Sequence, residues 1–112
     1  MINTVTIAGY IGAEPTMNIY GEATKVSFSV AVNTMIKGEE KTSWIPCECW
    51  GNQAIFVNNY LGSGSYVIVS GKIEQSSWES EEGEKKTRLF IYANQVESPK
   101  PKQEQKGGKK GK

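Results

Sequence analysis

Five segments of this chain alternate apolar residues with polar or small ones, a period that is typical of a β-strand with one buried face. The clearest is residues 25–33, where Val26, Phe28 and Val30 fall on one side and Ser27 and Ser29 on the other. Similar patterns occupy residues 3–11, 42–50, 66–74 and 86–93. The chain is therefore expected to be predominantly β.

One short helix is predicted between the third and fourth strands. Residues 52–61 place Ala54, Val57 and Leu61 at helical spacing. Asn52 is expected to cap the start, and Gly62 to end the helix in a left-handed conformation. This order of elements is that of the OB-fold, a five-stranded, partly open Greek-key barrel, so the fold class is all-β with one short helix. The residues expected to face the core from the last two strands are Val67, Val69, Gly71, Ile73, Leu89, Ile91 and Ala93.

Charge divides the chain into two parts. Residues 1–98 carry seven basic and eleven acidic side chains, a net charge of −4. Residues 99–112 carry six lysines and one glutamate among glycines and prolines, a net charge of +5. We expect one OB-fold domain over residues 1–98 and a disordered, basic Lys/Gly-rich tail over residues 99–112.

Several functional classes are disfavoured by composition. The chain has no histidine, no Gly-rich phosphate-binding loop and only two cysteines, Cys47 and Cys49. Their i, i+2 spacing predicts two buried thiols rather than a disulfide or a zinc site. The carboxylates cluster in polar segments, so we expect neither an enzyme nor a bound cofactor or metal. No apolar run is long enough to cross a membrane, and the alternating pattern begins at the N-terminus, which favours a cytoplasmic protein.

Three tryptophans lie where no core is predicted to cover them. Alternation along residues 42–50 places Ile45, Cys47 and Cys49 inside, and Trp44 and Trp50 outside. The third, Trp78, lies in the polar stretch 75–83, which is predicted to be a hairpin tip. Exposed indoles are unfavourable unless a ligand stacks on them, and the bases of single-stranded nucleic acid do so.

Residues 1–97 resemble the bacterial-type single-stranded DNA-binding protein (SSB) family. The resemblance rests on GYIGAEP (9–15), TSW (42–44), WGN (50–52), NYLGSGSYV (59–67), VSGKI (69–73) and SW (77–78). It implies an OB barrel, assembled as a homotetramer, that wraps single-stranded DNA without sequence preference in replication, recombination and repair. It also implies that Trp44, Trp50 and Trp78 stack on bases. The remaining candidates, for phosphate contact, are Lys25, Lys37, Lys41, Lys72, Lys85, Lys86 and Arg88.

The chain departs from the family pattern at one stacking position, at several basic positions around the tryptophans and at its C-terminal end. Where relatives often carry Arg or Lys, it has Pro46, Asn52, Ser63, Glu74, Ser76 and Ser77. A further stacking aromatic of some members would fall near Met35 and Ile36, so the predicted loop 34–41 is left with apolar contact and the charges of Lys37 and Lys41. Many members end in an acidic segment that recruits replication and repair proteins, whereas this chain ends in KKGK (109–112). Recruitment by that acidic route is therefore not expected.

Two alternatives stay open at this point. The acidic domain also fits an OB-type protein-interaction or assembly subunit with weak or no DNA binding. RNA is a possible second ligand, because every base offers a π-face for stacking.

The strand at residues 3–9 has no charged side chain that would disfavour pairing with another strand at its edge. It is therefore the expected site of pairing with a second subunit.

Overall fold

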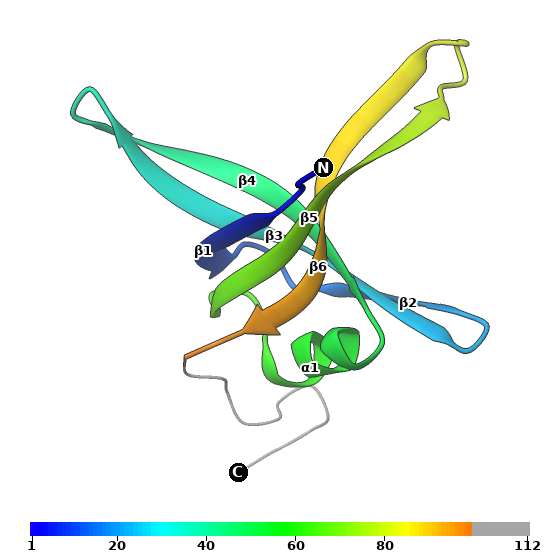
Figure 1. The fold of residues 1–112 in the computed structure, drawn as a ribbon, viewed down its shortest axis with the longest axis horizontal. Coiled ribbons are helices and arrows are strands. Elements are labelled where there is room, and N and C mark those ends of the chain that lie inside the picture. Colours follow the sequence, from blue (N-terminus) through cyan, green and yellow to red (C-terminus); the bar gives the residue numbers. More distant parts are fainter. Residues whose placement is uncertain (100–112) are drawn as a thin grey trace.

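Residues 1–99, the part of the chain that the computed structural model describes, form a closed five-stranded barrel with three projecting hairpins (Figure 1). The elements are β1 (Val5–Ile11), β2 (Thr16–Tyr20), β3 (Ala23–Ile36), β4 (Glu39–Trp50), α1 (Asn52–Tyr60), β5 (Tyr66–Glu79) and β6 (Lys85–Glu97). The strand order is β1-β5-β6-β4-β3-β2, and a further pairing of β1 with β3 closes the ring. The predicted all-β barrel with one short helix is confirmed.

The barrel closes through two short pairings and three long ones. β1 meets β3 only at Tyr10 and Ile11, and β4 meets β6 in parallel only at Cys47 and Glu48. The β3–β4 ladder, in contrast, runs from Lys25↔Trp50 to Ile36↔Glu39. Because the long antiparallel ladders extend beyond the barrel, their ends project as free hairpins.

The core is formed by the alternating residues that the sequence indicated. Its fully buried side chains include Val26 and Val30 from β3, Cys47 and Cys49 from β4, and Val57 from α1. The inward positions predicted for Val67, Val69, Gly71, Ile91 and Ala93 are also confirmed. Burial raises the pKa of both thiols to about 12, and the charge of the other thiol (at Cys47) or of Glu48 (at Cys49) adds to this. Both cysteines are free, as predicted, and remain protonated at neutral pH.

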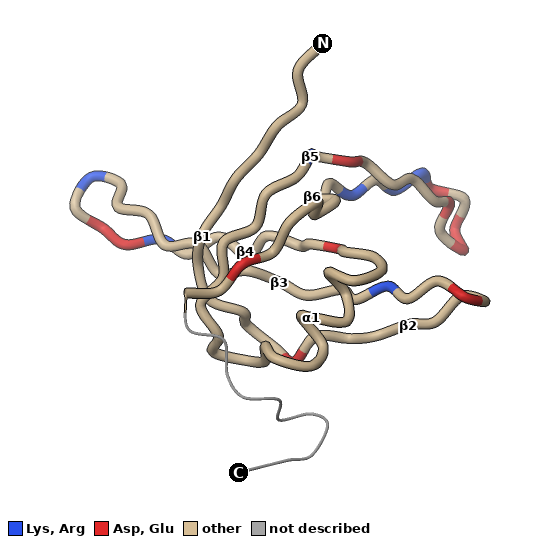
Figure 2. The backbone as a smooth tube through the Cα atoms, turned by 60° about the horizontal axis from the view of Figure 1, so that its bottom comes forward, with Lys and Arg blue, Asp and Glu red and all other residues tan. Residues whose placement is uncertain are grey.

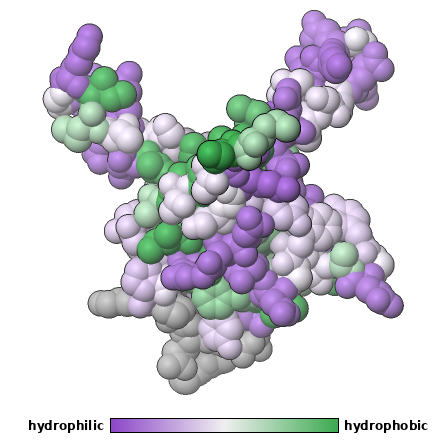
Figure 3. Space-filling model, viewed as in Figure 1, coloured by the Kyte–Doolittle hydropathy of each residue, from purple (hydrophilic) through white to green (hydrophobic). Residues whose placement is uncertain are grey.

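Two residues predicted to be in the core are not. Ile73 is 45% exposed and Leu89 is 60% exposed. Both lie where β5 and β6 leave the barrel, so no element of the described chain covers them. Together with Val5, Ile7 and Ile45 they line an open apolar groove of about 250 Å³. Figure 3 shows hydrophobic surface between the bases of the β3–β4 and β5–β6 hairpins.

The hairpins are longer than the sequence predicted. The expected loop 34–41 is almost entirely strand, and only Lys37 and Gly38 form the turn, both with positive φ. The expected hairpin tip 75–83 is mostly strand as well, because β5 continues to Glu79 and Trp78 pairs with Lys86. Strand β2, paired with β3 from Thr16↔Ser27 to Tyr20↔Ala23, was missed. All five of its residues are exposed, so no alternation marks it.

Helix α1 covers one end of the barrel, but its predicted caps are wrong. The N-cap is Gly51, with φ 66°, and no side chain caps the helix, so Asn52 is simply its first residue. Gly51 is fixed because its N–H donates to the carbonyl of Thr24. At the other end Leu61 is extended, and the left-handed glycine is Gly64, in the turn that follows.

No helix within residues 1–99 is long and apolar enough to cross a membrane. Most of the predicted tail lies outside the described residues, so its disorder and the 1–98 domain boundary stay predictions.

Candidate nucleic-acid interface

The outward face of β4 carries two of the three tryptophans. Trp44 is 61% exposed, and Trp50, at the end of the strand, is half-buried. Both point away from the buried Cys47 and Cys49, as alternation predicted. Trp44 lies against Gly12, because a Cβ built on Gly12 would come within 2.4 Å of its ring. A glycine at this position therefore leaves room for the indole to lie close to the barrel.

The strand register brings Trp78 to the same face. Glu48 on β4 is opposite Tyr92 on β6, and Tyr92 is opposite Lys72 on β5. Because residues i and i+2 share a face, Trp78, six residues after Lys72 on the same strand, lies on that side. Its side chain is 48% exposed, on the β5–β6 hairpin rather than at its tip. The three indoles thus share one surface, with Trp44 and Trp50 on the barrel and Trp78 on an arm.

An aromatic cluster that the sequence did not reveal surrounds Trp50. The ring of Tyr20, on the missed strand β2, lies 5.8 Å from that of Trp50. The ammonium of Lys25 lies 5.5 Å from the Tyr20 ring and 5.9 Å from the Trp50 ring. Tyr20 therefore adds a second ring, held against a cation, to the aromatic surface around Trp50. The local signal in the sequence for this hairpin is a glycine, Gly21, which takes a positive φ in the β2–β3 turn.

Two further rings belong to this surface. Phe90 and Tyr92, on β6, share the face of Glu48 and are half-buried. The guanidinium of Arg88 lies 5.5 Å from the Phe90 ring, and the ammonium of Lys72 lies 5.4 Å from the Tyr92 ring. Next to them is a hollow of about 230 Å³, lined in part by Ser27, Ser29 and Arg88. The surface therefore alternates rings with small polar residues.

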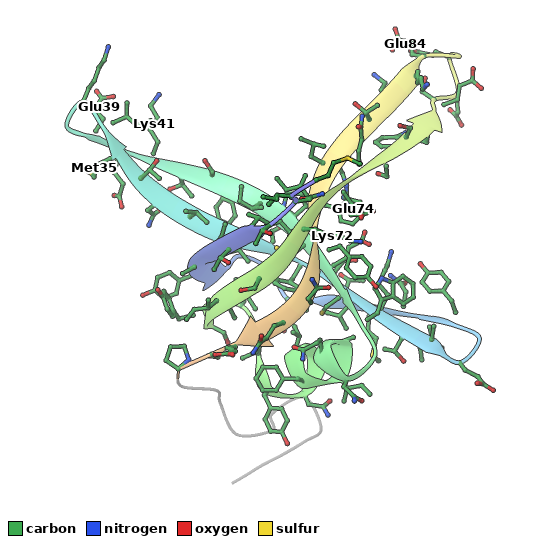
Figure 4. The ribbon with its side chains drawn as sticks, viewed as in Figure 1. Met35, Glu39, Lys41, Lys72, Glu74 and Glu84 are labelled. Atoms are coloured by element: carbon green, nitrogen blue, oxygen red, sulfur yellow. The ribbon has the colours of Figure 1, made fainter. Side chains whose placement is uncertain are left out.

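The predicted phosphate contacts fall into three environments. Lys25 and Arg88 both meet the carboxylate of Glu48, at 3.7 and 3.2 Å. Lys72 and Lys86 form exposed pairs with Glu74 and Glu84, at 3.3 and 3.2 Å. Figure 4 labels Lys72 and Glu74 on β5 and Glu84 near the hairpin tip. No carboxylate within residues 1–99 lies within 4.0 Å of the remaining three, which are Lys37, Lys41 and Lys85.

Acidic residues concentrate toward the ends of the hairpins. Glu39 and Glu40 lie beside Lys37 and Lys41 on the β3–β4 hairpin, and Glu81 and Glu82 occupy the tip between β5 and β6 (Figure 2). Met35 and Ile36 are exposed on the β3–β4 arm. The described residues contain no group of three or more metal-ligating side chains.

Comparison with known proteins identifies the family. Residues 2–99 match the family described as the single-strand binding protein family. The chain belongs to this family. It is 30% identical over 112 residues to single-stranded DNA-binding protein 1 of Staphylococcus aureus (strain COL), covering 96% of this chain and 67% of that protein. It is also 30% identical over 109 residues to single-stranded DNA-binding protein 1 of Nostoc sp., covering 96% and 91%. The mitochondrial single-stranded DNA-binding protein of Drosophila melanogaster is 34% identical over 102 residues, covering 85% and 69%. The family resemblance inferred from the sequence is confirmed.

Proposed function

We propose that this member of the single-strand binding protein family binds single-stranded DNA without sequence preference, chiefly by stacking bases on Trp44, Trp50 and Trp78. The observation that carries the proposal is that the barrel core is complete without these indoles, which lie on one outward face. Tyr20 continues the stacking surface beside Trp50. The family and its relatives named single-stranded DNA-binding proteins support DNA as the ligand.

Phosphate contact is assigned a smaller share of the affinity. Lys37, Lys41 and Lys85, which have no carboxylate partner within residues 1–99, are the first candidates. Lys72 and Lys86 follow, because their exposed pairs are weak and open readily. Few phosphate contacts release few counterions, so affinity should depend only shallowly on salt. The role is binding rather than catalysis: the protein would coat exposed strands and protect them during replication, recombination and repair.

Intrinsic tryptophan fluorescence during titration with oligo(dT), at about 50 and 200 mM salt, tests the proposal. Because all three tryptophans lie in the proposed interface, binding should quench most of the emission, and most of the quenching should survive the higher salt. A loss of quenching at the higher salt would assign more of the affinity to lysines. No quenching at the lower salt would reject DNA binding and favour the assembly-subunit alternative. A parallel titration with oligo(U) tests RNA as a second ligand.

We also propose that the protein assembles as a homo-oligomer, a tetramer, through β1 and the apolar groove beside it. Within residues 1–99, no strand pairs with the second edge of β1 from Val5 to Ala8. The adjoining groove exposes Ile73 and Leu89, which a second subunit would cover.

Sedimentation equilibrium tests this assembly. The unaltered protein should sediment as a tetramer, and Leu89→Lys should shift it to smaller species by introducing charge into the groove. Ile19→Lys is the matched control, because Ile19 is an exposed apolar residue on β2, away from the groove. A monomeric protein would contradict the assembly, and an unaffected L89K tetramer would place the interface elsewhere.

The cytoplasmic location also stays a prediction, which cell fractionation would test.

A further inference from the structure

Glu48 lies at the centre of the proposed interface and binds two cations through one oxygen. Its Oε2 atom lies 3.2 Å from Nη2 of Arg88, which donates a hydrogen bond to it, and 3.7 Å from Nζ of Lys25. The three residues come from β4, β6 and β3, so this cluster joins three adjacent strands. A phosphate bound by Lys25 and Arg88 would take the position that the carboxylate of Glu48 occupies between them.

The cluster differs from the other ion pairs on this surface in its burial. The side chain of Glu48 is 15% exposed and that of Lys25 is 18% exposed, whereas both members of the Lys72–Glu74 and Lys86–Glu84 pairs are at least 40% exposed. Arg88, at 47%, is as exposed as Lys72, so in its pair only the carboxylate is buried. Partly buried charges are screened less by salt than exposed ones, so the Glu48–Lys25 pair should persist where the exposed pairs open, and the buried carboxylate of Glu48 stays in place for Arg88.

Lys25 is constrained a second time by the rings of Tyr20 and Trp50, whose centroids lie 5.5 and 5.9 Å from its ammonium. Moving the ammonium out to a phosphate would break the contact with Glu48 and both cation–π contacts. The lysine therefore has three interactions that favour its present position, all within the protein.

We propose that Glu48 acts as an internal substitute for phosphate, which withholds Lys25 and Arg88 from the DNA backbone. This inference rests on the proposed function and specifies how the site divides its affinity. The centre of the interface then binds bases by stacking, and phosphate contact is left to lysines on the hairpins. Glu48 is a positioning residue in this scheme, because it acts through the two cations rather than by touching DNA.

The test is the salt dependence of oligo(dT) affinity for the full-length chain and its Glu48→Gln variant. A cation that contacts phosphate on a single strand adds about 0.7 to the slope of log affinity against log salt. Releasing Arg88 should therefore steepen the slope by about 0.7, and releasing Lys25 as well, against its two cation–π contacts, by up to about 1.4. The affinity lost between about 50 and 200 mM salt should then be between about 2.6-fold and sevenfold larger than for the unaltered protein.

Glu74→Gln is the matched control, since it removes the same charge from the same face but frees only the exposed Lys72. Its slope should change by less than half as much as that of E48Q. An E48Q slope equal to that of the unaltered protein would overturn the inference. So would an E74Q change as large as that of E48Q, because net charge would then explain both.

A second variant covers the case in which E48Q does not fold, as circular dichroism would show. Arg88→Gln leaves Glu48 paired with Lys25, and the inference expects its salt slope to stay within about 0.2 of the original. A fall of about 0.7 would overturn the inference, because Arg88 would then contact phosphate already. If the unaltered protein fails to bind oligo(dT) at all, the proposed function fails; if it binds but these slopes disagree, only the inference fails.

Discussion

Replacing Trp44 with alanine should weaken oligo(dT) binding between about 5-fold and 150-fold, because one base–aromatic stack contributes about 1–3 kcal/mol. Trp44 has the most exposed indole, and its ring lies against Gly12 rather than in the core. Its removal should therefore cost affinity without a large cost in stability. Titration of a fluorescently labelled oligonucleotide, followed by anisotropy, measures the change without relying on tryptophan emission.

Trp44→Phe and Ile55→Ala are the controls for this prediction. Phenylalanine keeps a ring for stacking, so W44F should recover most of the lost affinity. Ile55 is exposed on α1 and offers no aromatic ring to a base, so its truncation should leave affinity within about twofold. An unchanged affinity for W44A would remove Trp44 from the proposed interface.

Replacing Gly71 with alanine should lower the free energy of unfolding by about 3 kcal/mol, the upper part of the usual range for overpacking. A Cβ at this position would lie 2.0 Å from the carbonyl oxygen of Tyr92 and 3.0 Å from Cα of Ala93. These are backbone atoms of the paired strand, so β5 and β6 would have to separate at the bulge between Ser70 and Gly71. Urea unfolding followed by circular dichroism measures the change.

The matched control is Gly62→Ala, the same substitution where the nearest atoms belong to the side chain of Glu14. A flexible carboxylate can move aside, so the cost should stay below about 1 kcal/mol. Both variants should be compared at one protein concentration, because assembly would add to the apparent stability. Equal stabilities for the two variants would contradict the close approach of β5 and β6 at Gly71.

Alternation predicted this fold wherever one face of a strand is buried. Val26, Val30, Cys47 and Cys49 were placed correctly because the barrel covers one side of β3 and β4 and leaves the other open. The same rule was wrong for Ile73 and Leu89, because β5 and β6 leave the barrel there and no described element covers them. Apolar character alone does not tell a core position from one in an open groove.

The site was predictable to the extent that it depends on single strands. Alternation predicted the outward placement of Trp44 and Trp50, but Tyr20 was missed because no residue of β2 is buried. The position of Glu48 between Lys25 and Arg88 depends on strands that are far from it along the chain, with Arg88 40 residues away. Contacts set by tertiary pairing at such separations leave no local pattern in the sequence.

The three hairpins divide the molecule into a part that holds the fold and parts that reach beyond it. Trp44 and Trp50 belong to the barrel, whereas Trp78, Lys37 and Lys41 are on arms that contribute no residue to the buried core. Insertions, deletions and charge changes in the arms can therefore accumulate at little cost to stability. Under the proposed function, such changes would alter how far along a DNA strand the protein reaches, while the barrel that carries Trp44 and Trp50 stays the same.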